Sequence, residues 1–287
     1  MSGVKFRREL LAVTERAARR YPLAPVSSVF LPEPQRSAQS DPEFGVVTLV
    51  DGSAGLYYAW LGDSQCGLAE RFPPAELRNL TALGLARRYA SDDEGERSIG
   101  LAAINAITAA CWRDAGFVPP AARDPWGGEP LAPTETLGFI GNFPSLVRRA
   151  RSAGVEVVVV ERKAHWVHEE PGLKITLDPT ALLGCTRIIA TATVCLNDSL
   201  DDMLAYCAGA RSVSVIGPTA SFFPDPLFTR GVTSVGGLRV LDAVRLMASL
   251  RDRDPWQAYA ERYTLDPTSY PASLAMQRPA GVPGGAV

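Results

Sequence analysis

The chain has 287 residues, 46% of them hydrophobic, and its 29 basic and 31 acidic side chains nearly balance. This composition is typical of a globular protein long enough for two domains. A net charge near zero argues against nucleic acid as a partner, because binding to phosphates needs an excess of basic side chains. The sequence has no apolar run of membrane-spanning length and no apolar signal-peptide core, so we expect a cytoplasmic protein without a membrane partner.

The cysteines show no pattern typical of a metal or redox site. They are widely spaced and include no CxxC pair, and the chain holds only two histidines that could activate a thiol. We interpret them as buried thiols of a protein in a reducing compartment. They are Cys66, Cys111, Cys185, Cys195 and Cys207.

Residues 1–134 predict an N-terminal helix followed by a small α+β domain. Four apolar residues recur at helical spacing, which predicts a helix that buries one stripe and turns its arginines, Arg7 included, to solvent. The stripe consists of Phe6, Leu10, Val13 and Ala17. Residues 23–44, rich in Pro and Ser, are expected to form a surface loop.

Residues 44–72 contain three strand-like runs separated by turns, which predicts an antiparallel meander. Two helices are expected next, over residues 74–88 and 97–116. Asn105 is a polar position inside the apolar second helix. Its amide must either face a polar cleft or be satisfied internally.

Residues 135–253 predict a Rossmann-like domain. A strand over 137–140, a glycine turn, an Arg-rich helix and a second strand over 155–160 form a βαβ unit, and strands and helices then alternate. This pattern predicts a doubly wound, mainly parallel sheet, whose ligands lie beyond the carboxyl ends of its strands. Residues 254–287 are expected to be a C-terminal extension with a disordered end.

Four motifs in this order resemble the family known as putative heavy-metal chelation proteins. They are RSIGLAAINAI, then GFIGNFP with a following VVVVER, then TVCLND, and last VIGPTASFFPDPLFTRGVTSVGG. The resemblance covers roughly residues 44–250. It implies a small domain similar to the enolase N-terminal domain, joined to a Rossmann-like domain with a site between them. Together with the aromatic-rich extension after Asp254, it makes a homodimer plausible.

The resemblance also implies which residues line the cleft. We expect Asn105 and Asn197 to be the catalytic candidates and the glycine turn, the end of the second strand and two later strand ends to bind a cofactor. The cofactor-binding candidates are Gly138, Gly141, Asn142, Phe143, Glu161, Thr193, Gly217, Pro218 and Thr219.

The chemistry of these residues suggests an adenosine-type ligand. The amides of the GFIGNF turn precede a helix and would face an anionic group. The turn is not GxGxxG, and Phe143 and Pro144 occupy places that a pyrophosphate loop needs for small residues, which counts against NAD. Glu161 stands where Rossmann-type proteins hold a ribose diol. S-adenosylmethionine, which has no pyrophosphate, fits both observations.

Simpler structural roles remain open for several of these residues. Glu161 could be a solvated carboxylate that pairs with Arg162 or Lys163. The segment around Asn197 could serve only to cap the following helix, with Asp198 or Ser199 as the N-cap residue.

The sequence HWVHEE offers a second hypothesis, a metal site. His165 and His168 would share one face if they lay on a helix, and imidazole with carboxylate suits divalent zinc, nickel or iron. However, no third histidine or clustered thiol completes the site.

Two classes of function follow. The first is an enzyme that uses an adenosine-type ligand for group transfer or intramolecular displacement on a small metabolite, a transferase or lyase. The second is a protein that binds a metal or metal chelate. The apparent lack of an acid–base constellation suits the first class, since an activated sulfonium leaving group needs mainly orientation and exclusion of water.

Overall fold

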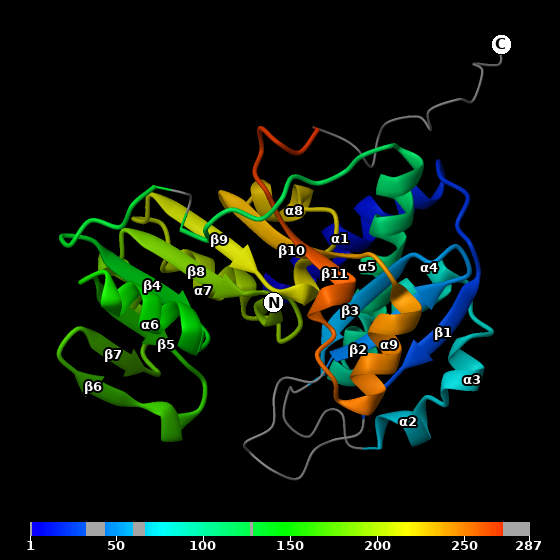
Figure 1. The fold of residues 1–287 in the computed structure, drawn as a ribbon, viewed down its shortest axis with the longest axis horizontal. Helices are drawn as coiled ribbons and strands as arrows, with labels where there is room; N and C mark the ends of the chain where they lie inside the picture. Colours follow the sequence, from blue (N-terminus) through cyan, green and yellow to red (C-terminus); the bar gives the residue numbers. More distant parts are fainter. Residues whose placement is uncertain (1, 33–43, 60–66, 127–128, 272–287) are drawn as a thin grey trace.

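The computed structural model describes residues 2–32, 44–59, 67–126 and 129–271 (Figure 1). They form a three-stranded antiparallel sheet and an eight-stranded, mainly parallel sheet, both packed against helices. The mixed α/β class predicted from the sequence is confirmed, and so is its doubly wound parallel sheet. Within the described part of the chain, no helix has both the length and the apolar character needed to span a membrane.

The small sheet is built differently from the predicted meander. Its strands, in spatial order, are β1 (Val26–Phe30), β2 (Phe44–Leu49) and β3 (Ala54–Tyr58). The prediction of a surface loop over residues 23–44 was wrong at β1. There Val26 and Val29 are buried and pair with β2. The third predicted strand was also wrong, because Leu68–Arg71 forms the short helix α2.

Helical segments accompany this sheet, and α5 packs directly on it. They are α1 (Ser2–Ala18), α3 (Pro74–Leu77), α4 (Ala82–Ala86), the 3-10 turn η2 (Arg87–Ala90) and α5 (Glu94–Asp114). The single helix expected over residues 74–88 is broken into α3, α4 and η2, and Thr81 caps α4 by accepting a hydrogen bond from the amide of Gly84. The apolar stripe of α1 is buried as predicted.

Helix α5 packs on β3 with almost no space between the two backbones. A methyl group added to Gly55 of β3 would lie 2.1 Å from the carbonyl oxygen of Ala102 in α5. Gly100 of α5 approaches η2 as closely, since a methyl group added to it would lie 2.2 Å from the amide nitrogen of Tyr89. Only glycine permits this approach, so the small residues of the helix and strand fix the depth at which α5 sits.

The large sheet takes up most of the remaining chain. Its elements are β4 (Thr136–Ile140), α6 (Pro144–Ser152), β5 (Glu156–Val160), η3 (Ala164–Trp166), β6 (His168–Glu170), β7 (Leu173–Thr176), η4 (Pro179–Gly184), β8 (Arg187–Thr191), η5 (Ala192–Cys195), α7 (Leu200–Ala205), β9 (Ser212–Ile216), η6 (Pro218–Ala220), α8 (Asp225–Phe228), β10 (Ser234–Val240), α9 (Ala243–Asp252), η7 (Gln257–Tyr259) and β11 (Ala260–Leu265).

The strand order is β11-β10-β9-β8-β4-β5-β7-β6, with antiparallel pairing only at the two edges. From β4 the chain continues to β5 on one side, and β8 lies on the other, so the strand order reverses between β4 and β8. Part of the expected C-terminal extension joins the sheet as β11. The disorder expected at its end, residues 278–287, lies outside the described residues.

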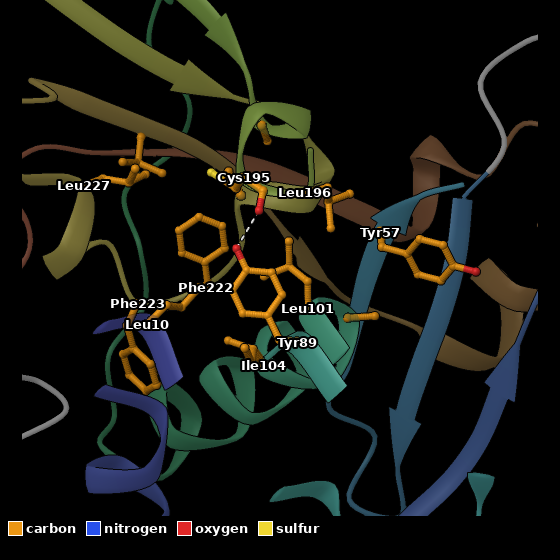
Figure 2. Packing of buried hydrophobic residues seen from close by; sticks show 14 of the residues in the cluster. Leu10, Tyr57, Tyr89, Leu101, Ile104, Cys195, Leu196, Phe222, Phe223 and Leu227 are labelled. Carbon is orange, nitrogen blue, oxygen red and sulfur yellow. Dashed lines mark hydrogen bonds between the residues drawn. The ribbon is translucent and has the colours of Figure 1, made fainter. Parts of the chain in front are cut away.

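Side chains alternate between the two faces of the large sheet, and a different layer of helices covers each face. Phe139 and Val159 point to the face covered by α6, together with Ile189. Ile140 and Ala190 point to the opposite face, where they join a core that continues through α7 and η5 to α5 and α1. Figure 2 shows part of this core, in which the hydroxyl of Tyr89 in η2 donates to the carbonyl of Cys195 in η5 at 2.6 Å.

A buried ion network fastens α1 to the large sheet. Nε of Arg7 lies 3.1 Å from one carboxylate oxygen of Asp198, and Nη1 of Arg97 lies 3.7 Å from the other. Arg7 is only 3% exposed, so its expected position facing solvent was wrong. The backbone of Asp198 is left-handed, a conformation that aspartate tolerates better than most residues.

We expect Asp198→Asn to destabilise the fold by about 2 kcal/mol, because it leaves two buried guanidinium groups without their shared counter-charge. The partial exposure of Asp198 keeps the loss below that of a fully buried pair. Urea unfolding measures it, with Asp252→Asn at the exposed end of α9 as the control. Equal unfolding free energies for the two variants would contradict this role.

Candidate functional site

The candidate site lies where the strand order reverses. Gly141 follows β4 with a φ of 87°, and a methyl group added to it would lie 2.8 Å from Cγ2 of Thr191 at the end of β8. Glycine meets both constraints, and other residues would be strained there. Because parallel strands end at one edge of the sheet, this position gathers several predicted residues. They are Gly141, Asn142, Glu161, Thr193, Gly217, Pro218 and Thr219.

The carboxylate of Glu161 is held by backbone amides. Oε1 accepts from the amide of Asn142 at 2.9 Å, and Oε2 accepts from the amide of Arg162 at 2.8 Å and weakly from that of Lys163 at 3.5 Å. Among the described residues Glu161 forms no ion pair with a lysine or arginine side chain. The amide of Asn142 is therefore committed to Glu161, although the sequence suggested that it would face an anionic ligand.

Tyr58, the last residue of β3, reaches this edge from the small sheet. Its amide donates to Oγ1 of Thr219 at 3.0 Å. Burial, and then the nearby charge of Glu161, raise the pKa of its phenol, so the hydroxyl remains a donor at neutral pH. Sequence reasoning missed Tyr58. The available signal was the Tyr57–Tyr58 pair, because neighbouring residues of a strand point to opposite faces and only one can enter the core.

Asn105 joins α5 to both sheets. Its Nδ2 donates to the carbonyl of Leu56 in β3 at 2.8 Å and to the carbonyl of Thr219 in η6 at 3.0 Å. The side chain is fully buried, and its Oδ1 has no hydrogen-bond partner among the described residues. The donors of the amide are thus used for structure, as one of the two interpretations of the sequence predicted, while its acceptor is unpaired.

The other predicted residues at the edge have local roles. The hydroxyl of Thr193 lies 3.2 Å from that of Thr191, and Gly217 adopts a φ of 138° before Pro218 opens η6. Gly217 packs against Ala192, since a methyl group added to it would lie 3.5 Å from Cβ of that residue. These contacts set the spacing of the loops that follow β8 and β9.

Three predicted residues make contacts away from the strand ends. Gly138 lies within β4, where an added methyl group would meet Sγ of Cys185 at 3.0 Å. Phe143 packs its ring against Phe139, 6.0 Å between centroids. Oδ1 of Asn197 accepts from the amide and the hydroxyl of Ser199, at 3.2 and 2.6 Å. Asn197 therefore organises the turn before α7.

The two histidines lie on different elements. His165 belongs to η3 and His168 to β6, so they do not share a helical face, and both are exposed. Nε2 of His168 lies 3.3 Å from a carboxylate oxygen of Glu170, which also pairs with Arg151. Within the described residues, no three histidine, cysteine, aspartate or glutamate side chains are grouped to hold a metal ion.

The described cysteines are buried and free, as the sequence suggested. Burial raises the pKa of Cys185 to about 11 and that of Cys207 to about 12. Their thiols are therefore neutral and poor nucleophiles at physiological pH. Cys66 lies outside the described residues.

Replacing Asn105 by alanine removes both donors and leaves two buried carbonyls unpaired. We expect a loss of roughly 2–4 kcal/mol in the free energy of unfolding, measured by urea denaturation. Asn79→Ala, at an exposed position, is the control and should change little. An Asn105→Ala protein as stable as the wild type would show that the two hydrogen bonds do not fasten the sheets.

Comparisons with known proteins agree with the sequence motifs. An uncharacterized protein of Methanocaldococcus jannaschii is 23% identical over 180 residues, which cover 61% of this chain and 68% of the relative. A protein with unknown function from Pyrococcus horikoshii has a similar fold, with a TM-score of 0.63 at 19% identity, over 93% of this chain and 100% of the other.

A protein with unknown function from Desulfitobacterium hafniense DCB-2 also has a TM-score of 0.63, at 18% identity, over 90% of this chain and 98% of the other. At these identities the likeness shows the fold. Both solved structures come from the family whose model, described as putative heavy-metal chelation, matches residues 127–263 of this chain. The predicted family resemblance is confirmed over residues 127–263, which match the model of the family described as putative heavy-metal chelation.

Proposed function

We propose that the chain is a small-molecule enzyme that binds an adenosine-type ligand, such as S-adenosylmethionine, at the carboxyl edge between β4, β5 and β3. One observation carries the proposal: the carboxylate of Glu161 is fixed by backbone amides and unpaired with any described cationic side chain. Each carboxylate oxygen has about two lone-pair sites. One site therefore remains on Oε1 for a ribose hydroxyl, and the second site on Oε2 is taken only by the weak 3.5 Å hydrogen bond from the amide of Lys163, which the other ribose hydroxyl would replace.

Residues from both sheets would complete this site. The phenol of Tyr58 can donate to a ligand from the side of the small sheet, and the hydroxyl of Thr219, which accepts from the amide of Tyr58, still has its own proton to donate. Asn105 acts through Thr219, whose carbonyl it holds. For group transfer or intramolecular displacement from a sulfonium, such residues orient the ligand and exclude water, and the leaving group needs no proton.

We expect Glu161→Gln to lower the affinity for S-adenosylmethionine at least about tenfold, because the amide offers one acceptor oxygen instead of two and loses the charge. Isothermal titration calorimetry measures the affinity. Glu156→Gln, at the exposed start of the same strand, is the matched control and should bind like the wild type. No binding by the wild-type protein, or equal binding by Glu161→Gln, would refute the proposed ligand.

Tyr58 gives this site a predictable response to pH. Since its raised pKa keeps the phenol protonated, ligand binding should hold from pH 7 to about pH 10, the ordinary pKa of tyrosine, and fall only above it. Tyr58→Phe should weaken binding and remove the alkaline fall. An affinity that already decreases with a midpoint below pH 10 in the wild type, and not in Tyr58→Phe, would show that the pKa is lowered instead.

The family description supports a second candidate, binding of a metal or metal chelate. With no described group of three metal-ligating side chains, the metal would arrive with donors of its own ligand, or bind at His165 and His168. Elemental analysis after incubation with Zn²⁺ and Ni²⁺, followed by gel filtration, tests this function. Stoichiometric metal that is lost in a His165→Ala/His168→Ala protein would favour it.

We also propose a homodimer, and light scattering after gel filtration tests it. The aromatic residues of the C-terminal extension support a homodimer less than the sequence suggested. Tyr263 and Tyr270 are each 3% exposed and pack around Trp112 within the same chain. A dimer would therefore have to use other surfaces.

A further inference from the structure

A cavity lined mainly by polar and charged residues lies at the opposite edge of the large sheet. Its volume is about 240 Å³, slightly below the range of roughly 300–1,000 Å³ that is usual for ligand sites. It opens at the amino ends of β8, β9 and β10, whose first residues, Arg187, Ser212 and Ser234, line it together with Arg211 and Glu129. The proposed adenosine site lies beyond the other ends of these strands, so the two regions are separate.

Arg187 makes this cavity a built site. It is 3% exposed, and its Nη1 donates to the carbonyls of Trp126 and Glu129, at 2.5 and 3.2 Å, while Nη2 donates to that of Pro130 at 3.2 Å. Its Nε donates to Glu135 at 3.0 Å. A guanidinium has five N–H donors, so one on Nη2 is left without a short hydrogen bond.

Arg211 stands beside Arg187 and shares its partners. Its Nη2 donates to the same oxygen of Glu135 at 2.6 Å, and its other donors make no hydrogen bond among the described residues. Two guanidinium groups thus meet at one carboxylate that is 11% exposed. Like charges so close together favour a second anion between them.

Glu129 occupies that second position loosely. Its Oε2 lies 3.6 Å from Nη2 of Arg187 and 3.5 Å from Nη2 of Arg211, beyond good hydrogen-bond distance, and its side chain is 69% exposed. An exposed ion pair at such distances contributes little to stability. Glu129 can therefore leave at small cost.

Hydroxyl groups add donors to the floor of the cavity. The hydroxyl of Ser214 donates to the carbonyl of Pro125, so it accepts from the hydroxyl of Ser234. Both hydroxyl protons are therefore used, and neither serine has a proton left for a ligand. Thr264 accepts from the amide of Arg123 and keeps its own proton free, and the hydroxyl of Ser212 has no hydrogen-bond partner among the described residues. Free donors from two arginines and two hydroxyls line the cavity, and the two other carboxylates that line it, Asp124 and Asp266, are paired with Arg149 and Arg123.

We propose that this cavity binds the oxyanion of a small metabolite, a phosphate or carboxylate group, between Arg187 and Arg211, and that the carboxylate of Glu129 is displaced when the ligand binds. Arginine forks match both groups, because two parallel N–H donors meet two oxygens. The adenosine ligand is not required for this proposal, so either site can be tested while the other fails.

Calorimetric titration with inorganic phosphate, at constant ionic strength maintained with sodium chloride, tests the site. The wild type should bind one phosphate saturably. Arg211→Ala should weaken binding at least about tenfold, since it removes charge-assisted donors. The control is Arg148→Ala, an exposed arginine of α6 that forms no ion pair among the described residues, and it should bind like the wild type. A parallel titration with acetate shows whether phosphate or carboxylate is preferred.

Glu129→Gln supplies a test in the opposite direction. It removes a competing charge at an exposed position, so the fold is retained and phosphate affinity should rise several-fold. Circular dichroism checks that each variant is folded. Failure of both phosphate and acetate to bind the wild type, Arg211→Ala binding as well as the wild type, or Glu129→Gln binding more weakly would overturn the proposal.

Discussion

The fold depends on the side-chain amide of Asn105. This one group, on the central helix α5, holds a carbonyl of the small sheet and a carbonyl of the loop after β9 at the same time. The two sheets therefore share a polar joint at this point, next to the hydrogen bond from the amide of Tyr58 to Thr219. The close approach permitted by Gly55 brings the joint within reach, since a bulkier residue in β3 would push α5 away from Leu56. The position of Tyr58 near the charge of Glu161 depends on that joint.

Parts of this arrangement could be predicted from the sequence. Apolar strands alternating with helices determine a parallel sheet, and its topology alone places Gly141, Glu161 and Thr193 at one edge. Periodicity also predicted the buried stripe of α1. These features depend on local pattern and on the handedness of crossovers, which a single chain displays directly.

Other features depend on partners that are distant in the sequence. From the sequence Arg7 was expected at the surface, because its counter-charge, Asp198, belongs to a loop of the large sheet that is distant in the sequence. β1 lies in a Pro- and Ser-rich stretch and is a strand because β2 pairs with it. The role of Tyr58 follows from how deeply α5 packs, which no periodicity encodes. For the same reason, the sequence could not show that Asn142 and Glu161 bind each other.

The ties between α1 and the C-terminal half also bear on how the protein is made. Glu9 pairs with Arg230, and Arg7 pairs with Asp198, so the first helix finds these two ionic partners only after most of the chain has left the ribosome. Until then its apolar stripe has no complete core to enter. Such long-range contacts slow folding and prolong the exposure of apolar surfaces that can aggregate. We therefore expect the nascent N-terminal helix to be the segment that most needs protection by a chaperone during synthesis.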